Sequence, residues 1–306
     1  MTTIKSKKGP ERHPFTVSSK KVFLEKLPVH REKALQIATG SHPTSRVLIT
    51  DLRASCSMIF LLRTESFGLF QSFREGSDTY RVTDSIEFAG CTRYIIRNTM
   101  LRGVLRRILA SVLRGDGCSE IEPCGMCALC RLFGYMRGGD RSGNSRIEVM
   151  ESASVEARTP CVVTSRSVDI ENPIRRDAEV VPPGTHFLTI IRLTEPTLQD
   201  IADVVLGMEY AGQHGIGART ATGGKLSVKP LAILGGYWTQ LGSPWPILET
   251  ITEPTPAGIE MAVRAYLDKI SRGLPYLMGD ELEDAINAIL PLSALYPRHE
   301  VRNEAA

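Results

Sequence analysis

Alternating apolar positions and short apolar runs predict a series of strands along the chain. The predicted strands span residues 47–49, 58–62, 145–150, 186–193 and 226–234. The run 58–62 is apolar at every position, which is typical of a central strand that is buried on both faces of a sheet. Residues 161–164 are also strand-like, but the prolines around them indicate a hairpin-like excursion over 155–185.

Apolar residues at helical spacing predict helices over 92–114, 197–210, 257–271 and 281–290. The first of these has the most regular apolar stripe. The stripe consists of Leu101, Val104, Leu105, Ile108, Val112 and Leu113.

The elements follow the order strand, helix, strand, then strand, helix, strand. This order predicts an α+β fold with the split βαβ order of a ferredoxin-like (RRM-like) βαββαβ core. We interpret the remaining sequence as additions to one domain that spans 1–306. These additions are a basic N-terminal arm (1–40), an insertion (64–90), a Cys-rich insertion (115–145), the hairpin (155–185) and a C-terminal helical segment (247–306).

Composition describes an ordinary globular protein, with 42% apolar and 23% charged residues in a chain of 306. No apolar run approaches the ~20 residues that a transmembrane helix needs, and the first residues lack the hydrophobic stretch of a signal peptide. We therefore expect a cytoplasmic protein without a membrane partner. In that reducing compartment disulfides are not expected, and we interpret Cys56, Cys91 and Cys161 as small core residues.

Charge is unevenly distributed along the chain. Residues 1–33 carry a net charge of +6, whereas residues 247–306 carry −5. Between Lys33 and Lys225 every positive side chain is an arginine, whose planar fork suits bidentate binding of phosphate and stacking on bases. Codon bias in a GC-rich genome would produce the same arginine preference, so the preference alone does not identify a partner.

The predicted helix 92–114 is strongly basic. No acidic residue occurs between Phe88 and Gly115, and like charges four positions apart on a helix repel one another. Its arginines are Arg93, Arg97, Arg102, Arg106, Arg107 and Arg114. Either an anionic ligand lies against this helix, or acids from elsewhere in the fold neutralise it.

Four cysteines lie within thirteen residues: Cys118, Cys124, Cys127 and Cys130. Four thiolates are the number that closes a tetrahedral zinc site, and the two-residue gaps let successive sulfurs converge. An iron–sulfur cluster and free thiols are the alternatives, although iron–sulfur motifs of this spacing typically continue to a further Cys followed by Pro. A closed four-ligand site predicts a structural Zn²⁺ rather than a catalytic one.

Five glycines between 212 and 224 form a second candidate site. Glycine lets backbone amides approach a phosphate closely, and Arg219 and Lys225 would add positive charge. The spacing does not match a nucleotide-binding P-loop, and a tight turn would use the same residues. His214 lies beside this loop and is either a base-stacking residue or a solvated side chain.

Four motifs in order resemble those of the backbone subunits of CRISPR effector complexes in the repeat-associated mysterious protein (RAMP) superfamily. They are TMLRGVLR at 99–106, LFG at 132–134 with SRIEV at 145–149, VVPPGTHF at 180–187, and GIGAR through GGKL at 215–226. The turn at 63–66 and the Cys-rich insertion resemble the type I-D variant. The resemblance covers roughly 60–235.

This resemblance implies a subunit of an antiviral Cascade-like complex that repeats as a helical filament along guide (CRISPR) RNA, with other effector subunits as partners. The hairpin 155–185 would be the thumb that reaches over the neighbouring copy, and the guide would be presented to a complementary single-stranded target. The implied phosphate contacts are Arg97, Arg102, Arg106, Arg146, Arg219 and Lys225. The implied thumb and base contacts are Arg166, Arg175, Arg176 and His214.

Two other functions remain open from the sequence. Type III relatives cut target RNA with an acid after the first strand, and the 64–90 insertion offers Glu65, Asp78 and Asp84, but outside the family's glycine–aspartate context. We therefore expect no enzymatic activity, with a metal-dependent nuclease as the alternative. A standalone zinc-dependent nucleic-acid-binding regulator is the third possibility, but the chain has no helix-turn-helix pattern.

Overall fold

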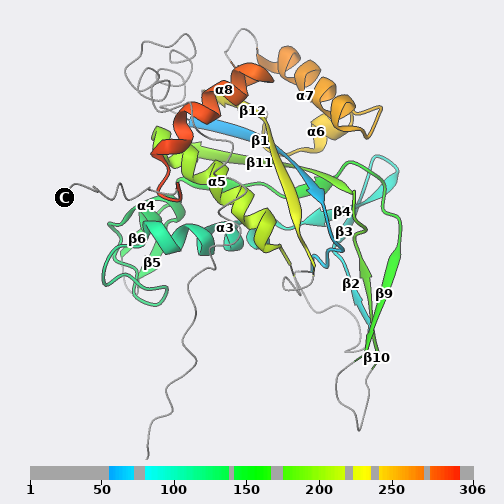
Figure 1. Cartoon of the computed structure of the whole chain (residues 1–306), viewed down its shortest axis with the longest axis horizontal. Helices are drawn as coiled ribbons and strands as arrows, with labels where there is room; N and C mark the ends of the chain where they lie inside the picture. The colour runs from blue at the N-terminus through cyan, green and yellow to red at the C-terminus, as the bar shows by residue number, and fades with distance from the viewer. Residues whose placement is uncertain are drawn as a thin grey trace, which may run out of the picture.

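The computed structural model describes residues 55–71, 80–137, 141–166, 175–217, 223–235, 241–271 and 276–296. The fold is a mixed α+β arrangement built on an eight-stranded antiparallel sheet (Figure 1). The predicted strand 47–49 and the arm 1–40 lie outside the described residues. Among the described helices, none combines the length and hydrophobicity that a bilayer crossing requires.

The prediction of a central strand at 58–62 is confirmed. Strand β1 (Ser55–Thr64) pairs with β11 (His186–Thr194) on one side and β12 (Leu226–Gly235) on the other, both antiparallel. In Figure 1 the blue β1 lies between the green β11 and the yellow β12. Nine of its ten residues are buried, because both faces of the sheet are covered.

The two faces of β1 contribute to two separate hydrophobic cores, as the alternation of side chains along a strand requires. Met58, Phe60 and Leu62 belong to one core, and Ile59 and Leu61 to the other. Helices α3 (Asn98–Leu113), α5 (Leu198–His214) and α8 (Asp280–Ile289) cover the first face, and α6 (Trp245–Leu248) and α7 (Pro256–Ser271) the second.

The outer strands are short. β7 (Ile147–Val149) and β8 (Ser152–Ser154) both pair with β11. The predicted strand 145–150 corresponds to β7 alone, and β8 is an additional strand. The edges of the sheet are β3 (Ser85–Phe88), reached through β4 (Cys91–Ile96), and β13 (Tyr276–Met278), which pairs with β12. The last described helical element, η3 (Leu290–Leu292), packs against α5.

The predicted helix 92–114 begins six residues late, at Asn98. Residues 91–96 form strand β4 instead, because Ala89 and Gly90 adopt positive φ values of 50° and 78° and turn β3 back into β4. Thr92, Tyr94 and the two isoleucines before Arg97 also favour a strand. The inward stripe differs in one position, since Leu109 is buried and Val112 is 40% exposed.

The hairpin 155–185 contains two antiparallel strands, β9 (Cys161–Arg166) and β10 (Arg175–Val180). Strand β2 (Tyr80–Val82), from the 64–90 segment, adds to β10 in parallel and completes a three-stranded sheet. Figure 1 shows this small sheet extending away from the main sheet. The 64–90 segment thus supports the hairpin instead of forming an independent insertion.

A partly buried ion pair fixes the root of this hairpin. The Nε and Nη2 atoms of Arg158 each donate to one carboxylate oxygen of Glu179, both at 2.6 Å, and Glu179 is 5% exposed. The hydroxyl of Tyr94 donates to the Thr159 carbonyl at 2.6 Å. The hairpin therefore leaves the core in a defined direction.

We expect Arg158→Ala to lower the free energy of unfolding by about 2–3 kcal/mol, because it leaves the buried Glu179 carboxylate without its partner. Urea unfolding measures this change. Lys229→Ala is the matched control, since its ion pair with Glu260 has side chains 62% and 37% exposed, and should cost less than about 1 kcal/mol. Equal effects of the two substitutions would contradict the structural role assigned to Arg158.

Candidate metal centre and nucleic-acid interface

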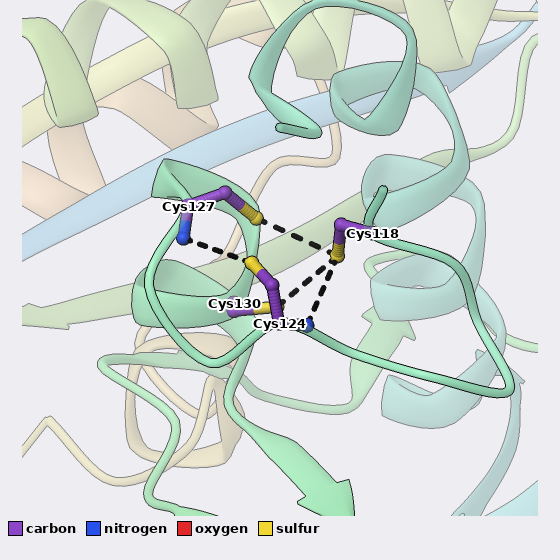
Figure 2. Close-up of side chains that lie close together, drawn as sticks. All are labelled: Cys118, Cys124, Cys127 and Cys130. Atoms are coloured by element: carbon purple, nitrogen blue, oxygen red, sulfur yellow. Dashed lines mark hydrogen bonds between the residues drawn. The ribbon is translucent and has the colours of Figure 1, made fainter. Parts of the chain in front are cut away.

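The four clustered cysteines converge as their spacing predicts. Figure 2 shows the side chains of Cys118, Cys124, Cys127 and Cys130 pointing toward one another. The four sulfurs all lie within 4.8 Å of each other. The Sγ of Cys118 is 3.6 Å from that of Cys130 and 3.7 Å from that of Cys127. This cluster could bind a metal ion.

The spacing of the sulfurs fits a single tetrahedral ion. Four thiolates at 2.3 Å from one ion lie about 3.8 Å apart along the edges of the tetrahedron. Two of the sulfur–sulfur distances, 3.6 and 3.7 Å, match that edge closely, and the others are no longer than 4.8 Å. A cluster of several irons would hold its thiolates farther apart, because irons and sulfides lie between them.

Backbone amides point at the sulfurs and favour their ionised form. The amides of Cys127 and Met126 donate to the Cys124 sulfur at 3.2 and 3.4 Å, and these bonds lower the pKa of that thiol. Burial raises the pKa of Cys127, but amide donors from Gly115 and Cys130 outweigh it and lower the value to about 6. Burial raises the pKa of Cys130 to about 12, so without a cation the four thiols cannot all ionise.

Helix α4 (Ala128–Phe133) anchors the cluster to the main core. Its residues Leu129, Leu132 and Phe133 are all at most 2% exposed and belong to the same core as α3 and α5. The short hairpin of β5 (Tyr135–Arg137) and β6 (Arg141–Gly143) follows directly. In Figure 1 this Cys-rich insertion and the hairpin 155–185 lie at opposite ends of the fold.

A cavity of about 350 Å³ opens between α3, the Cys-rich insertion and the β5–β6 hairpin. We refer to it as the basic pocket. It is lined by Arg102, Arg106, Glu120, Pro123, Phe133, Gly134, Tyr135, Met136, Gly143 and Ser145. Two of the ten arginine, lysine and histidine residues expected to contact RNA therefore face the same space.

Arg102 and Arg106 differ in how they are held. The Nη2 of Arg102 donates to the Phe133 carbonyl and, at 3.2 Å, to the Ser145 hydroxyl, while its guanidinium lies 5.6 Å from the centre of the Phe133 ring. Burial and the charge of Arg106 lower the pKa of Arg102. Within the described part of the chain, no hydrogen bond or ion pair holds Arg106, so its charge is available to a ligand.

Arg97 and Arg146 are occupied by carboxylates. Arg97 precedes the first residue of α3 and bonds Glu151 at 2.8 Å and Asp84 at 3.4 Å. Arg146 bonds Asp200 at 3.0 Å and also donates to two backbone carbonyls. Both arginines tie strands to neighbouring elements, which weakens their interpretation as phosphate contacts.

The other expected contacts are not among the described residues that line the basic pocket. Arg166 and Arg175 are paired across the β9–β10 hairpin, and Arg176 follows in β10. Arg219 lies outside the described residues, as does Asp78. The exposed residues that flank the glycine loop are His214, which ends α5, and Lys225, which precedes β12.

Three described amides in and beside the glycine loop are used within the protein. The Ile216 amide donates to the Gly224 carbonyl, and the Gly224 amide donates to the Phe67 carbonyl, both at 2.8 Å. The Lys225 amide donates to the Ser66 hydroxyl at 3.0 Å. These amides are not free to cradle a phosphate, so here the glycines serve close backbone packing.

Gly224→Ala should therefore lower the free energy of unfolding by about 3 kcal/mol. Its φ is +72°, and an added Cβ would lie 2.1 Å from the Ile216 carbonyl oxygen. Gly103→Ala is the control, because an added Cβ meets nothing within 4 Å on α3 and should stabilise by up to about 1 kcal/mol. Chemical denaturation of both variants tests this assignment, and an unchanged Gly224 variant would contradict it.

The remaining cysteines and acids have ordinary surroundings. Cys56 is fully buried in the core, and burial raises its pKa. Cys91 and Cys161 were also expected in the core, but both are only half-buried, so that prediction is wrong for them. Glu65 is exposed, and among the described residues the cysteine cluster is the only group of three or more such side chains placed to hold a metal.

The sequence alone did not identify the pocket as a unit. Phe133, Gly134 and Ser145 are part of the conspicuous motifs at 132–134 and 145–149, but nothing in their spacing shows that they face Arg102 and Arg106. Tyr135 and Met136 directly follow the first of these motifs.

No protein-family model matches the chain, and no curated protein matches it. Solved structures do share its fold. A match to Thermofilum pendens Csc2 has a TM-score of 0.55 and 16% identity, covering 78% of this chain and 82% of that one. A chain of a CRISPR RNA-guided surveillance complex, pre-nicking, has a TM-score of 0.50 and 10% identity, covering 72% and 90%. At these identities the likeness shows a common α+β fold with an antiparallel sheet.

Proposed function

We propose that this protein binds guide RNA as a repeating backbone subunit of a type I, Cascade-like CRISPR effector complex, of the type I-D variant. The observation that carries the proposal is the pair of arginines on α3 that face one cavity without a matching pair of acids, in a fold shared with Csc2. Fold alone does not imply function, so the site has to supply the argument.

The proposed core is ferredoxin-like. Its support is the strand order β12–β1–β11–β7/β8, with α3 between β1 and β7 and α5 between β11 and β12. The Cys-rich insertion enters after the first of these helices. The small sheet of β2, β9 and β10 would be the thumb that reaches toward the next copy.

The proposed metal is Zn²⁺, held by all four cysteines. Thiolate sulfurs are preferred ligands of zinc, and a site with four protein ligands leaves no position for a substrate. When bound, the ion would brace the insertion and compensate the charge of the ionised thiols. The protein itself would hold the site in place, because α4 packs against the main core.

The proposal assigns no catalytic step to this chain. Of the described acids in the 64–90 segment, Asp84 is bonded to Arg97, and Glu65 and Glu87 are exposed. The partners would be guide RNA, other copies of the chain, other effector subunits and a complementary single-stranded target, all in the cytoplasm.

Titration of the nucleic-acid-free protein with single-stranded RNA tests this function. Affinity should fall with salt at a log–log slope of roughly −0.7 for each phosphate neutralised. Particle size should grow with RNA length if copies add along the strand. Weak binding with no salt dependence, by a protein that stays monomeric, would contradict the proposal.

Two further arms of the titration separate the alternatives. A nuclease would cut the RNA at regular intervals and would stop when Mg²⁺ is chelated, whereas a binding subunit leaves the RNA intact under both conditions. A standalone regulator would prefer a defined duplex site over single-stranded RNA.

A further inference from the structure

The basic pocket is unusual because polar and apolar walls meet in it. Arg102 and Arg106 come from α3, and Tyr135 and Met136 come from the first strand of the β5–β6 hairpin. Its volume of about 350 Å³ lies at the lower end of the range of small-molecule sites in proteins. A single nucleotide fits that scale.

The charged wall is suited to one phosphate group. Arg102 is held in place by the Phe133 carbonyl and the Ser145 hydroxyl, so its fork is oriented before a ligand arrives. The acid in the lining, Glu120, bonds Arg114 at 3.3 Å and is 74% exposed. The positive charge of the two arginines in the pocket therefore exceeds the negative charge beside them. An anion between the two arginines would relieve their repulsion.

The apolar wall of the pocket contains a side chain that is exposed to solvent and so does not contribute to the folded core. Met136 is 87% exposed although it lines the cavity. The Tyr135 ring is held against Gly125 and Gly143, where an added Cβ would lie 2.8 and 2.3 Å from ring atoms. Only glycine at these positions leaves room for the ring, so Tyr135 forms a fixed edge of the pocket.

We propose that the basic pocket holds one nucleotide of single-stranded RNA, with its phosphate between Arg102 and Arg106 and its base against Tyr135 and Met136. This inference rests on the proposed function and adds to it a specific site that reads a base face as well as the backbone. Aromatic and apolar contact with a base is tolerant of sequence, because every base has such a face. The site would therefore accept any guide sequence.

An affinity comparison with two probes tests the proposal on the full chain. The probes are an oligouridine and an abasic ribose-phosphate strand of the same length. Met136→Ser should weaken binding of oligouridine about fivefold and leave the abasic strand unchanged. Arg106→Gln should weaken both, with a salt slope reduced in magnitude by about 0.7.

The control variant is Met261→Ser, on α7 at the other face of the sheet, where the Met is 63% exposed. It should bind both probes like the wild type. Photocrosslinking with 4-thiouridine should in addition label the peptide that contains Tyr135 and Met136.

The outcomes distinguish this inference from the function on which it rests. RNA binding by the wild type that neither Met136→Ser nor Arg106→Gln weakens, with crosslinks elsewhere, would overturn the pocket and leave the RNA-binding function standing. Equal weakening of both probes by Met136→Ser would overturn the contact with a base. Failure of the wild type to bind either probe would overturn both proposals.

Discussion

Cys127→Ser is expected to abolish stable metal binding and to unfold residues 115–127 of the Cys-rich insertion, while α4 and the main sheet persist. The Cys127 sulfur lies 3.7 Å from that of Cys118 and forms one corner of the tetrahedron. Its loss therefore leaves only three thiolates. Structural zinc sites contribute on the order of 10 kcal/mol to the folding of small elements, whereas α4 packs into a core that does not depend on the ion. Metal analysis should fall from about one ion per chain to nearly none.

Hydrogen exchange would locate the accompanying structural change. Protection should be lost over 115–127 and retained in α4, β1, β11 and β12. Cys91→Ser is the matched control, because the Cys91 sulfur donates to the Phe88 carbonyl and lies outside the cluster. A metal-replete Cys127 variant with normal protection would contradict the four-cysteine site.

Arg106→Glu is expected to reduce the affinity for single-stranded RNA by about 100-fold at low salt, because it removes one phosphate contact and adds a repulsive charge. Arg106 has no protein partner among the described residues, so the fold should tolerate the change. Fluorescence anisotropy at several salt concentrations measures the loss, and circular dichroism with thermal unfolding monitors the fold.

Arg264→Glu provides the same charge change on α7, at the opposite face of the sheet. It should leave the affinity within a few-fold of the wild type. Similar losses in both variants would mean that only net charge matters and that α3 makes no local contact. Reversal at Arg102 is a less informative experiment, since its bonds to Phe133 and Ser145 would be lost as well.

The strong elements of the fold were predictable because a local pattern determines them. β1 is apolar at consecutive positions, and α5 begins with a capping box between Thr197 and Asp200. Residues 92–96 were assigned to the helix whose apolar stripe begins at Leu101, but the turn at Ala89–Gly90 makes them part of a strand. Strands of three residues, such as β2 and β13, are too short to carry a period.

The roles of individual arginines could not be predicted, because their partners come from distant segments. Arg97 meets Glu151, and Arg146 meets Asp200, each 54 positions away. Sequence spacing shows charge but not which charges are neutralised in the fold. The cysteine cluster was predictable for the opposite reason. Its four ligands are close in sequence, and clustered thiols serve few purposes other than metal binding.

The position of β1 at the centre of the sheet affects how the chain is made. This strand is synthesised before both strands that flank it, because they belong to 186–235 and Thr64 meets Thr185 only 121 positions later. At cellular synthesis rates of 5–20 residues per second, that gap lasts on the order of 10 s. During this interval β1 is an apolar strand whose two edges lack their native partner strands. Productive folding on the ribosome therefore requires that a chaperone or a neighbouring segment of the chain binds these edges for a time.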